Sequence, residues 1–160
     1  MRRTVTAIIV ATLVCLPCGS ADKMSWNLIR YVGGTVQVKT SRYDWNTTVT
    51  VTNDAIVVEI APVTVFLSKT TVRLKPSQVL TLSSNEAAWR QVAAVDGAQL
   101  PAKHPSLFGL LLDSEYVGLV YDAGDGKRGA VLVESQRPGL IMQMLRVLSK
   151  VMGKSVENAP

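Results

Sequence analysis

The stretch Asp122–Gly129, DAGDGKRG, places three glycines around Lys127 and Arg128, a composition that suits phosphate binding. A Walker-type phosphate loop needs G-x-x-x-x-G-K-[ST] between a strand and a helix, whose N-terminus then faces the anion. Here Tyr121 stands where the first glycine belongs, and Arg128 replaces the serine or threonine. The residues that follow, GAVLVE, have the composition of a strand. The stretch is therefore predicted to be a β-hairpin that turns at its Asp-Gly step.

The other residues that could do chemistry are isolated from one another. His104 is the only histidine, and a proline follows it, so we interpret it as a surface residue. The closest acidic pair, Asp113 and Glu115, is explained by solvated charges, and no serine lies in a G-x-S-x-G elbow. Asp122 and its neighbours lack the alternating acidic residues of a calcium loop. We predict no catalytic residue, no cofactor and no metal, and hence that the protein is not an enzyme.

Residues 1–21 have the layout of a secretory signal peptide. Two arginines precede a thirteen-residue apolar run, residues 4–16, and small residues follow it. As a helix this run would cover about 20 Å, less than the ~30 Å hydrocarbon core of a bilayer. Cleavage after Ala21 and export to the periplasm or the medium are therefore expected. Lipidation of Cys18 is the disfavoured alternative, because the residues before it form a poor lipobox.

Cleavage at Ala21 would remove both cysteines, Cys15 and Cys18, so the exported domain must fold without a disulfide. A chain of this length can bury enough surface to do so. Loss of two arginines lowers the formal net charge from +5 to about +3. Aromatic residues make up only 6% of the chain, and no strand interleaves them with bases, as stacking platforms require. We expect no nucleic-acid partner.

The first half of the chain after the signal is predicted to be mostly β-structure. Residues 22–33 are expected to be an irregular lead, and the alternating TVQVKT that follows Gly34 is expected to be a strand. Asn46–Ile60 predicts a hairpin, because β-branched residues flank Asn53 and Asp54, which tolerate positive φ. Further short strands are expected at 63–67, 70–74 and 78–84.

The middle of the chain carries weaker signals. In residues 87–97 the alanines favour a helix, whereas Trp89 and Val92 fit a strand, and we favour the strand. Residues 97–114 have no periodicity and are expected to form a long loop with an apolar run at 107–112. Two strands, YVGLVYD and GAVLVES, should then flank the hairpin turn.

The last predicted element is an amphipathic helix over about residues 138–152. Apolar residues recur there at spacings of three and four, a proline lies in its first turn, and Gly153 stands at the C-terminal cap position. Its apolar face should cover inward-facing valines and leucines of the strands. Residues 155–160 are expected to be a frayed tail. The predicted apolar face comprises Leu140, Ile141, Met144, Leu145 and Leu148, and the strand residues beneath it are Val49, Val51, Val117, Leu119, Val131 and Val133.

Basic residues concentrate toward the C-terminal end of the chain. Residues 127–154 contain six bases and one acid, whereas residues 76–126 contain two bases and six acids. This end is either an ordinary solvated face or a surface attracted to anionic headgroups. In the second case the apolar run 107–112 would insert beside it, unless that run is buried. The candidate membrane or partner surface consists of Leu107, Phe108, Leu111, Lys127, Arg128, Arg146 and Lys150.

The order of these elements resembles the pleckstrin-homology-like fold. The resemblance covers residues 34–154 and is carried most by YVGLVYDAGDGKRGAVLVESQRPGLIMQMLRVLSKVMG, which looks like the last hairpin and capping helix of bacterial members. The same unit is similar to small secreted bacterial proteins of no assigned function. The resemblance implies a mainly β fold: a barrel or roll of about seven antiparallel strands with one C-terminal helix plugging its open end. It transfers no site residue.

Pleckstrin-like folds generally bind headgroups or peptides through loops and open strand edges. The leading expectation is therefore an exported, non-catalytic binding or scaffolding module of the bacterial cell envelope, whose partner is an unknown protein or a lipid headgroup. The alternative is a peripheral membrane-associating protein that uses the apolar loop 107–112 and the basic C-terminal face.

Overall fold

The computed structural model describes residues 23–39, 41, 43–61, 68–101, 115–137 and 139–158. The predictions for the signal peptide with its cysteines, for a strand at 63–67, for His104 and for the apolar run 107–112 all lie outside these residues. In chain order the elements are β1 (Met24–Gly34), β2 (Thr47–Val51), β3 (Ile56–Ile60), β4 (Thr70–Leu74), a 3₁₀ turn η1 (Pro76–Gln78), β5 (Val79–Ser84), α1 (Asn85–Ala93), β6 (Glu115–Gly124), β7 (Lys127–Ser135), α2 (Leu140–Met152) and β8 (Val156–Glu157).

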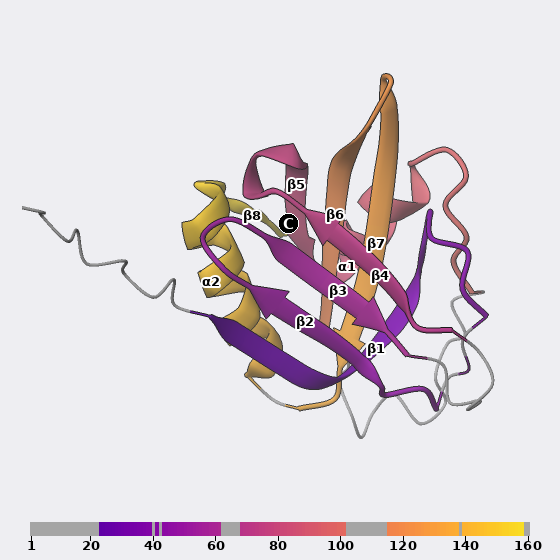
Figure 1. Ribbon diagram of the computed structural model, residues 1–160, viewed down its shortest axis with the longest axis horizontal. Coiled ribbons are helices and arrows are strands. Elements are labelled where there is room, and N and C mark those ends of the chain that lie inside the picture. Colours follow the sequence, from indigo (N-terminus) through magenta and orange to yellow (C-terminus); the bar gives the residue numbers. More distant parts are fainter. Residues whose placement is uncertain are drawn as a thin grey trace, which may run out of the picture.

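The described strands form one eight-stranded sheet in the order β4-β3-β2-β1-β7-β6-β5-β8, so the mainly β class is confirmed. The sheet does not close, and β4 and β8 are its two ends. Strand β1 joins its two halves: the first part pairs with β2, and the second part, from Arg30, pairs with β7. Figure 1 shows the half formed by β1–β4 lying in front of the half formed by β5–β7.

The prediction of an irregular lead at 22–33 is wrong, because most of it is β1. Two bulges hide the strand from a period-two reading, one between Trp26 and Ile29 and one between Tyr31 and Gly33. At the first bulge Leu28 takes a φ of 59° and is 44% exposed. Each bulge adds a residue and shifts the alternation of buried side chains, which bends the strand from one half of the sheet into the other.

Two further elements differ from prediction. Residues 35–39 of TVQVKT are not a strand: the N–H of Thr35 donates to Ala130 O at 2.9 Å, and the chain then bends away from β7. Residues 85–93 form helix α1 rather than the strand that we favoured. At the first residue of this helix the Asn85 side chain accepts a hydrogen bond from the Tyr116 N–H at 3.1 Å, which joins the start of α1 to β6.

Helix α1 packs on β6 through very small residues, so its buried face contains few large apolar side chains. A Cβ atom on Gly118 would lie 2.9 Å from Ala88 Cβ and 2.9 Å from Ser83 Oγ, so only glycine permits this approach. The buried residues of α1 are Ala87, Ala88 and Val92. The helix therefore agrees with the helix propensity of its alanines, and the close packing on β6 is what requires them to be small.

Both predicted hairpins are confirmed, but only one has the predicted turn. Asp125 and Gly126 have φ of 53° and 71°, as a two-residue turn between β6 and β7 requires. Asn53 and Asp54 do not have positive φ. They lie in a four-residue connection that Thr52 closes, since its N–H donates to Ala55 O at 2.8 Å and its hydroxyl accepts from the Ala55 N–H at 3.0 Å.

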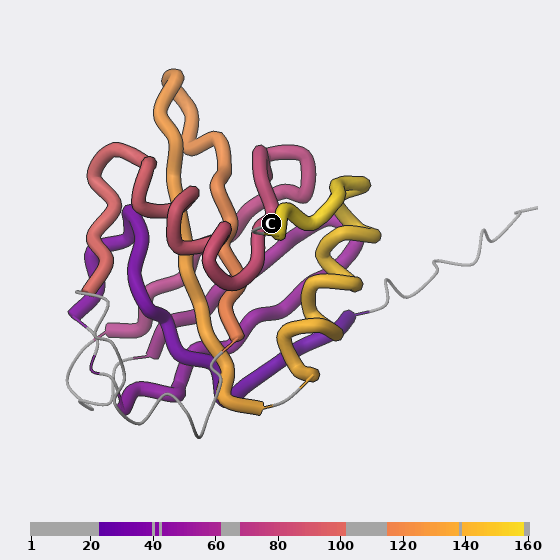
Figure 2. Tube along the Cα trace, turned by 180° about the vertical axis from the view of Figure 1, so that it is seen from behind, coloured from indigo at the N-terminus to yellow at the C-terminus, as the bar shows by residue number. Residues whose placement is uncertain are grey.

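The main core lies between the two halves of the sheet, and α2 covers one end of it (Figures 1 and 2). Helix α2 and its Gly153 cap at φ 62° confirm the predicted C-terminal helix; residue 138, where we placed its start, lies outside the described residues. Leu140 is only half-buried, whereas four other predicted residues of the apolar face are buried. All six predicted strand residues are at most 3% exposed: Val49, Val51, Val117, Leu119, Val131 and Val133.

A smaller core on the other face of β6 and β7 is covered by α1. The prediction of a frayed tail is wrong, because β8 pairs in parallel with Leu82 and Ser83 of β5. Hydrogen bonds from Ser84 to Asn158 and from Gln91 to Glu157 also hold this segment. Neither α1 nor α2 has the length and hydrophobicity that a bilayer-crossing helix requires.

Candidate functional site

The structure divides the predicted basic surface into two separate places. Lys127 and Arg128 begin β7 at the tip of the β6–β7 hairpin, whereas Arg146 and Lys150 lie exposed on α2. Figure 1 shows the hairpin tip and α2 at well-separated positions on the molecule. The four bases therefore do not form one patch. The three apolar members of the predicted surface lie outside the described residues.

The hairpin tip is close to electrically balanced. In the antiparallel register Asp122 lies opposite Arg128, and Gly124 lies opposite Lys127. Asp125 occupies the turn, and its side chain is exposed like those of the two bases. The charge asymmetry along the sequence thus disappears at this tip. The hairpin brings Asp122 and Asp125, the last two acids of residues 76–126, close to Lys127 and Arg128, the first two bases of residues 127–154.

A cleft of about 700 Å³ lies between this tip, the chain that leaves β1 and the turn after α1. Lys127 and Arg128 come from the hairpin, and Asp96 comes from the turn. Thr35 fixes the third side, because its hydroxyl accepts a hydrogen bond from the Ala130 N–H at 3.0 Å. The complete lining is Thr35, Ala94, Val95, Asp96, Gly97, Gly126, Lys127 and Arg128.

The turn after α1 is held by its own hydrogen bonds and by contacts with a distant loop. The Val95 N–H donates to Val92 O at 3.2 Å, and the Ala98 N–H donates to Val95 O at 3.0 Å. Gly97, at φ 77°, accepts a weaker hydrogen bond from the Gln37 side chain at 3.4 Å. This wall is therefore preformed, and its one carboxylate faces a cleft that also has two cationic side chains.

The cleft combines charged groups with a small apolar surface. Among the described residues, its lining includes no histidine, cysteine or serine side chain. Two long cationic side chains, one carboxylate and the largely buried Val95 offer charge pairing beside a small apolar contact. Across the described residues, no group of three or more histidine, cysteine, aspartate or glutamate side chains is placed to hold a metal ion.

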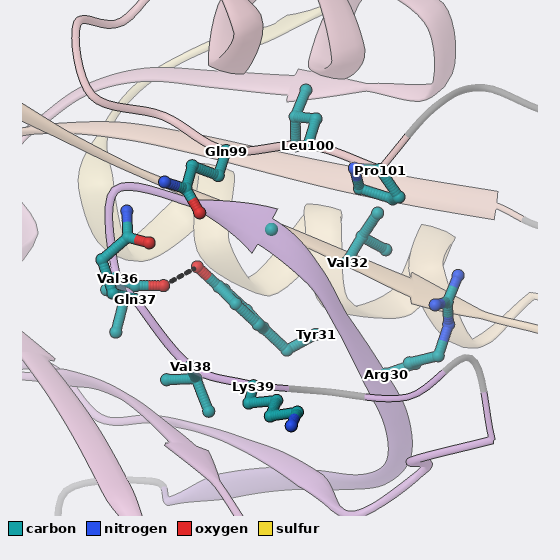
Figure 3. Close-up of a pocket in the computed structure, with 11 residues that line it drawn as sticks. Arg30, Tyr31, Val32, Val36, Gln37, Val38, Lys39, Gln99, Leu100 and Pro101 are labelled. Carbon is teal, nitrogen blue, oxygen red and sulfur yellow. Dashed lines mark hydrogen bonds between the residues drawn. The ribbon is translucent and has the colours of Figure 1, made fainter.

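A second cavity, of about 350 Å³, lies where residues 99–101 cross the end of β1 (Figure 3). A Cβ atom on Gly33 would lie 2.2 Å from Gln99 O, so glycine is required for this crossing. The Tyr31 hydroxyl donates to Val36 O at 2.9 Å and forms one wall of the cavity. Sequence reasoning missed this cavity. The adjacent glycines Gly33 and Gly34 are the available signal in the sequence.

Burial raises the pKa of the Tyr31 phenol above its ordinary value, and the nearby Tyr121 raises it further. The unfolded chain therefore loses this proton near pH 10, while the folded chain still holds it. Because the native state then binds more protons than the unfolded state, the free energy of unfolding should fall as the pH rises above about 10. Thermal midpoints measured from neutral to strongly alkaline pH test this.

Tyr31→Phe is the matched control for alkaline sensitivity. At neutral pH this variant should have a free energy of unfolding about 1 kcal/mol lower than the parent, because the hydrogen bond to Val36 O is lost. Above pH ~10 its thermal midpoint should then decline less than that of the parent. Identical alkaline slopes for the two proteins would contradict the assignment to Tyr31.

The cleft at the hairpin combines the residue that follows β1, the turn that follows α1 and the tip of the β6–β7 hairpin, which lie far apart in sequence. Comparison with known proteins adds no ligand for it: no protein-family model matches the chain, and a search of curated proteins finds no match.

Proposed function

We propose that this protein is an exported, non-catalytic binding or scaffolding module of the bacterial cell envelope. The observation that carries the proposal is the cleft whose lining brings together Lys127, Arg128 and Asp96. Such a cleft can bind a partner segment that presents both an acidic and a basic group, because it offers two cations and one carboxylate. Export is supported by the signal-like sequence of residues 1–21.

We further propose a pleckstrin-homology-like roll for the fold. The antiparallel succession β4-β3-β2-β1-β7-β6-β5 and the C-terminal helix over the core support it. The additional helix α1 and the parallel strand β8 depart from the simple expectation of one helix and about seven strands. In the described part of the chain, β4 pairs only with β3, which leaves an open strand edge of the kind that peptides use.

Site-specific photo-cross-linking in the producing bacterium tests the cleft. We expect a photoreactive residue at Asp96 to give a discrete adduct, because this exposed position lines the cleft. The same residue at Asp54, an exposed position that is not part of the cleft, is the control. Intact mass would distinguish a protein adduct from a lipid adduct.

The double variant Lys127→Glu and Arg128→Glu should abolish the Asp96 adduct without changing the thermal midpoint, since both side chains are exposed. Equal adducts at Asp96 and Asp54, or an Asp96 adduct that survives the double charge reversal, would argue against binding in the cleft.

A further inference from the structure

The outer face of α2 carries charge of one sign. Met142, Arg146 and Lys150 follow one another at intervals of four residues and therefore form one stripe along the helix. All three are exposed, Met142 to 58%. The helix contains no acidic residue, and an exposed arginine, Arg137, precedes it. We call Met142, Arg146 and Lys150 the α2 stripe.

The elements around α2 do not neutralise the α2 stripe in the way that Asp122 and Asp125 neutralise the hairpin tip. The turn η1, which packs against α2, contains no acid and follows the exposed Lys75. Lys154 follows the helix cap. The nearest acid in sequence, Glu157, is hydrogen-bonded to Gln91 of α1.

The chain enters the folded domain beside this helix. Strand β1 begins at Met24, and the Trp26 indole N–H donates to the Gln143 side chain of α2 at 3.2 Å. Figures 1 and 2 both show the start of β1 on the side that α2 occupies. Only seven residues separate the end of the apolar run at Leu16 from Met24. Fully extended, they span at most roughly 25 Å.

We propose that the α2 stripe is a docking face for a bilayer surface with anionic headgroups. The short connection to the apolar run keeps α2 near a bilayer whenever that run is in one, before cleavage or with Cys18 lipidated. The two cations complement the negative headgroups, and Met142 supplies a shallow apolar contact. Each cation that lies near such a surface strengthens binding roughly fivefold. The docking is independent of the cleft.

Fluorescence of the full-length chain in vesicles tests the proposal. Cys15 and Cys18 are changed to serine, and Met142→Cys carries an environment-sensitive fluorophore. The protein is reconstituted into phosphatidylcholine vesicles with or without phosphatidylglycerol. We expect a blue shift and quenching by a lipid-borne quencher only in vesicles that contain phosphatidylglycerol. A fluorophore on Ala123→Cys, exposed at the hairpin tip, should stay unquenched in both vesicles.

Charge reversal supplies the matched pair of variants. Arg146→Glu with Lys150→Glu should abolish the lipid-dependent quenching at position 142, whereas Lys127→Glu with Arg128→Glu should leave it unchanged. The second pair also separates the two proposals, because it should abolish the Asp96 cross-link while docking persists. Circular dichroism should show the parent spectrum for both pairs, since all four side chains are exposed.

Three results would overturn docking by the α2 stripe. The first is an unshifted position-142 signal in both vesicles, and the second is quenching that does not depend on phosphatidylglycerol and survives reversal of Arg146 and Lys150. The third is a shift that appears in detergent without lipid and grows with protein concentration, which would assign the face to a second copy of the chain.

Discussion

Leu145→Asp is expected to unfold the domain. Leu145 is 4% exposed and belongs to the core that α2 shares with both halves of the sheet. Loss of a buried leucine side chain alone costs about 2–5 kcal/mol, and an unpaired buried carboxylate adds several more. Domains of this kind are stable by only about 5–15 kcal/mol. The variant should therefore show no cooperative thermal transition by circular dichroism.

Arg146→Asp is the matched control, because it places the same side chain one position further along the same helix. Arg146 is exposed, so its replacement should change the free energy of unfolding by less than about 1 kcal/mol. A Leu145→Asp protein that melts near the parent midpoint would show that α2 does not seal the core. Unfolding of both variants would instead indicate that helix propensity, and not burial, dominates.

Helix α2 and the β6–β7 hairpin could be predicted from sequence because their signals are local. Apolar residues at helical spacing and a glycine stop define α2, and both conditions are met where expected. The Asp125-Gly126 step needs only two residues with positive φ. In both cases the residues that determine the element lie within it or next to it in sequence. No tertiary contact therefore has to be known in advance.

Strands β1 and β8 could not be predicted in this way, because distant residues determine them. The local signal for helix α1 is mixed, since its alanines favour a helix whereas Trp89 and Val92 fit a strand. Two bulges in β1 shift the alternation that identifies a strand. Helix α1 can approach the sheet closely only because residue 118, on strand β6, is a glycine. The two residues of β8 have no pattern of their own and form a strand only because the edge of β5 is available to them.

The candidate site shows the same division between local and distant information. The sequence identifies the basic residues of the candidate surface, but the strand topology decides where they lie on the molecule. These residues are Lys127, Arg128, Arg146 and Lys150. The hairpin returns Arg128 to the level of Asp122, which cancels the charge at the tip. The third wall of the cleft, with Asp96, is a turn at the end of the segment 87–97, for which the sequence favours a strand. Only α2 keeps the uncompensated charge that the sequence predicted.

The Arg30–Glu134 ion pair should be the most sensitive polar contact in the fold. The two residues are cross-strand partners on β1 and β7, and their side chains are only 16% and 5% exposed. Arg30 also lies over the Trp45 ring at 5.9 Å. Glu134→Leu removes one partner and leaves a largely buried guanidinium uncompensated, so it should destabilise the domain by about 3–5 kcal/mol in chemical denaturation.

The double variant Arg30→Met with Glu134→Leu should recover most of that loss, because two apolar side chains can replace a buried pair at little cost. Recovery should fall short by about 0.5–2 kcal/mol, the contribution of the cation–π contact with Trp45. A double variant as unstable as Glu134→Leu would mean that Arg30 does not depend on Glu134. The loss would then lie in the packing of β7, and the joint between the two halves of the sheet would be apolar instead of ionic.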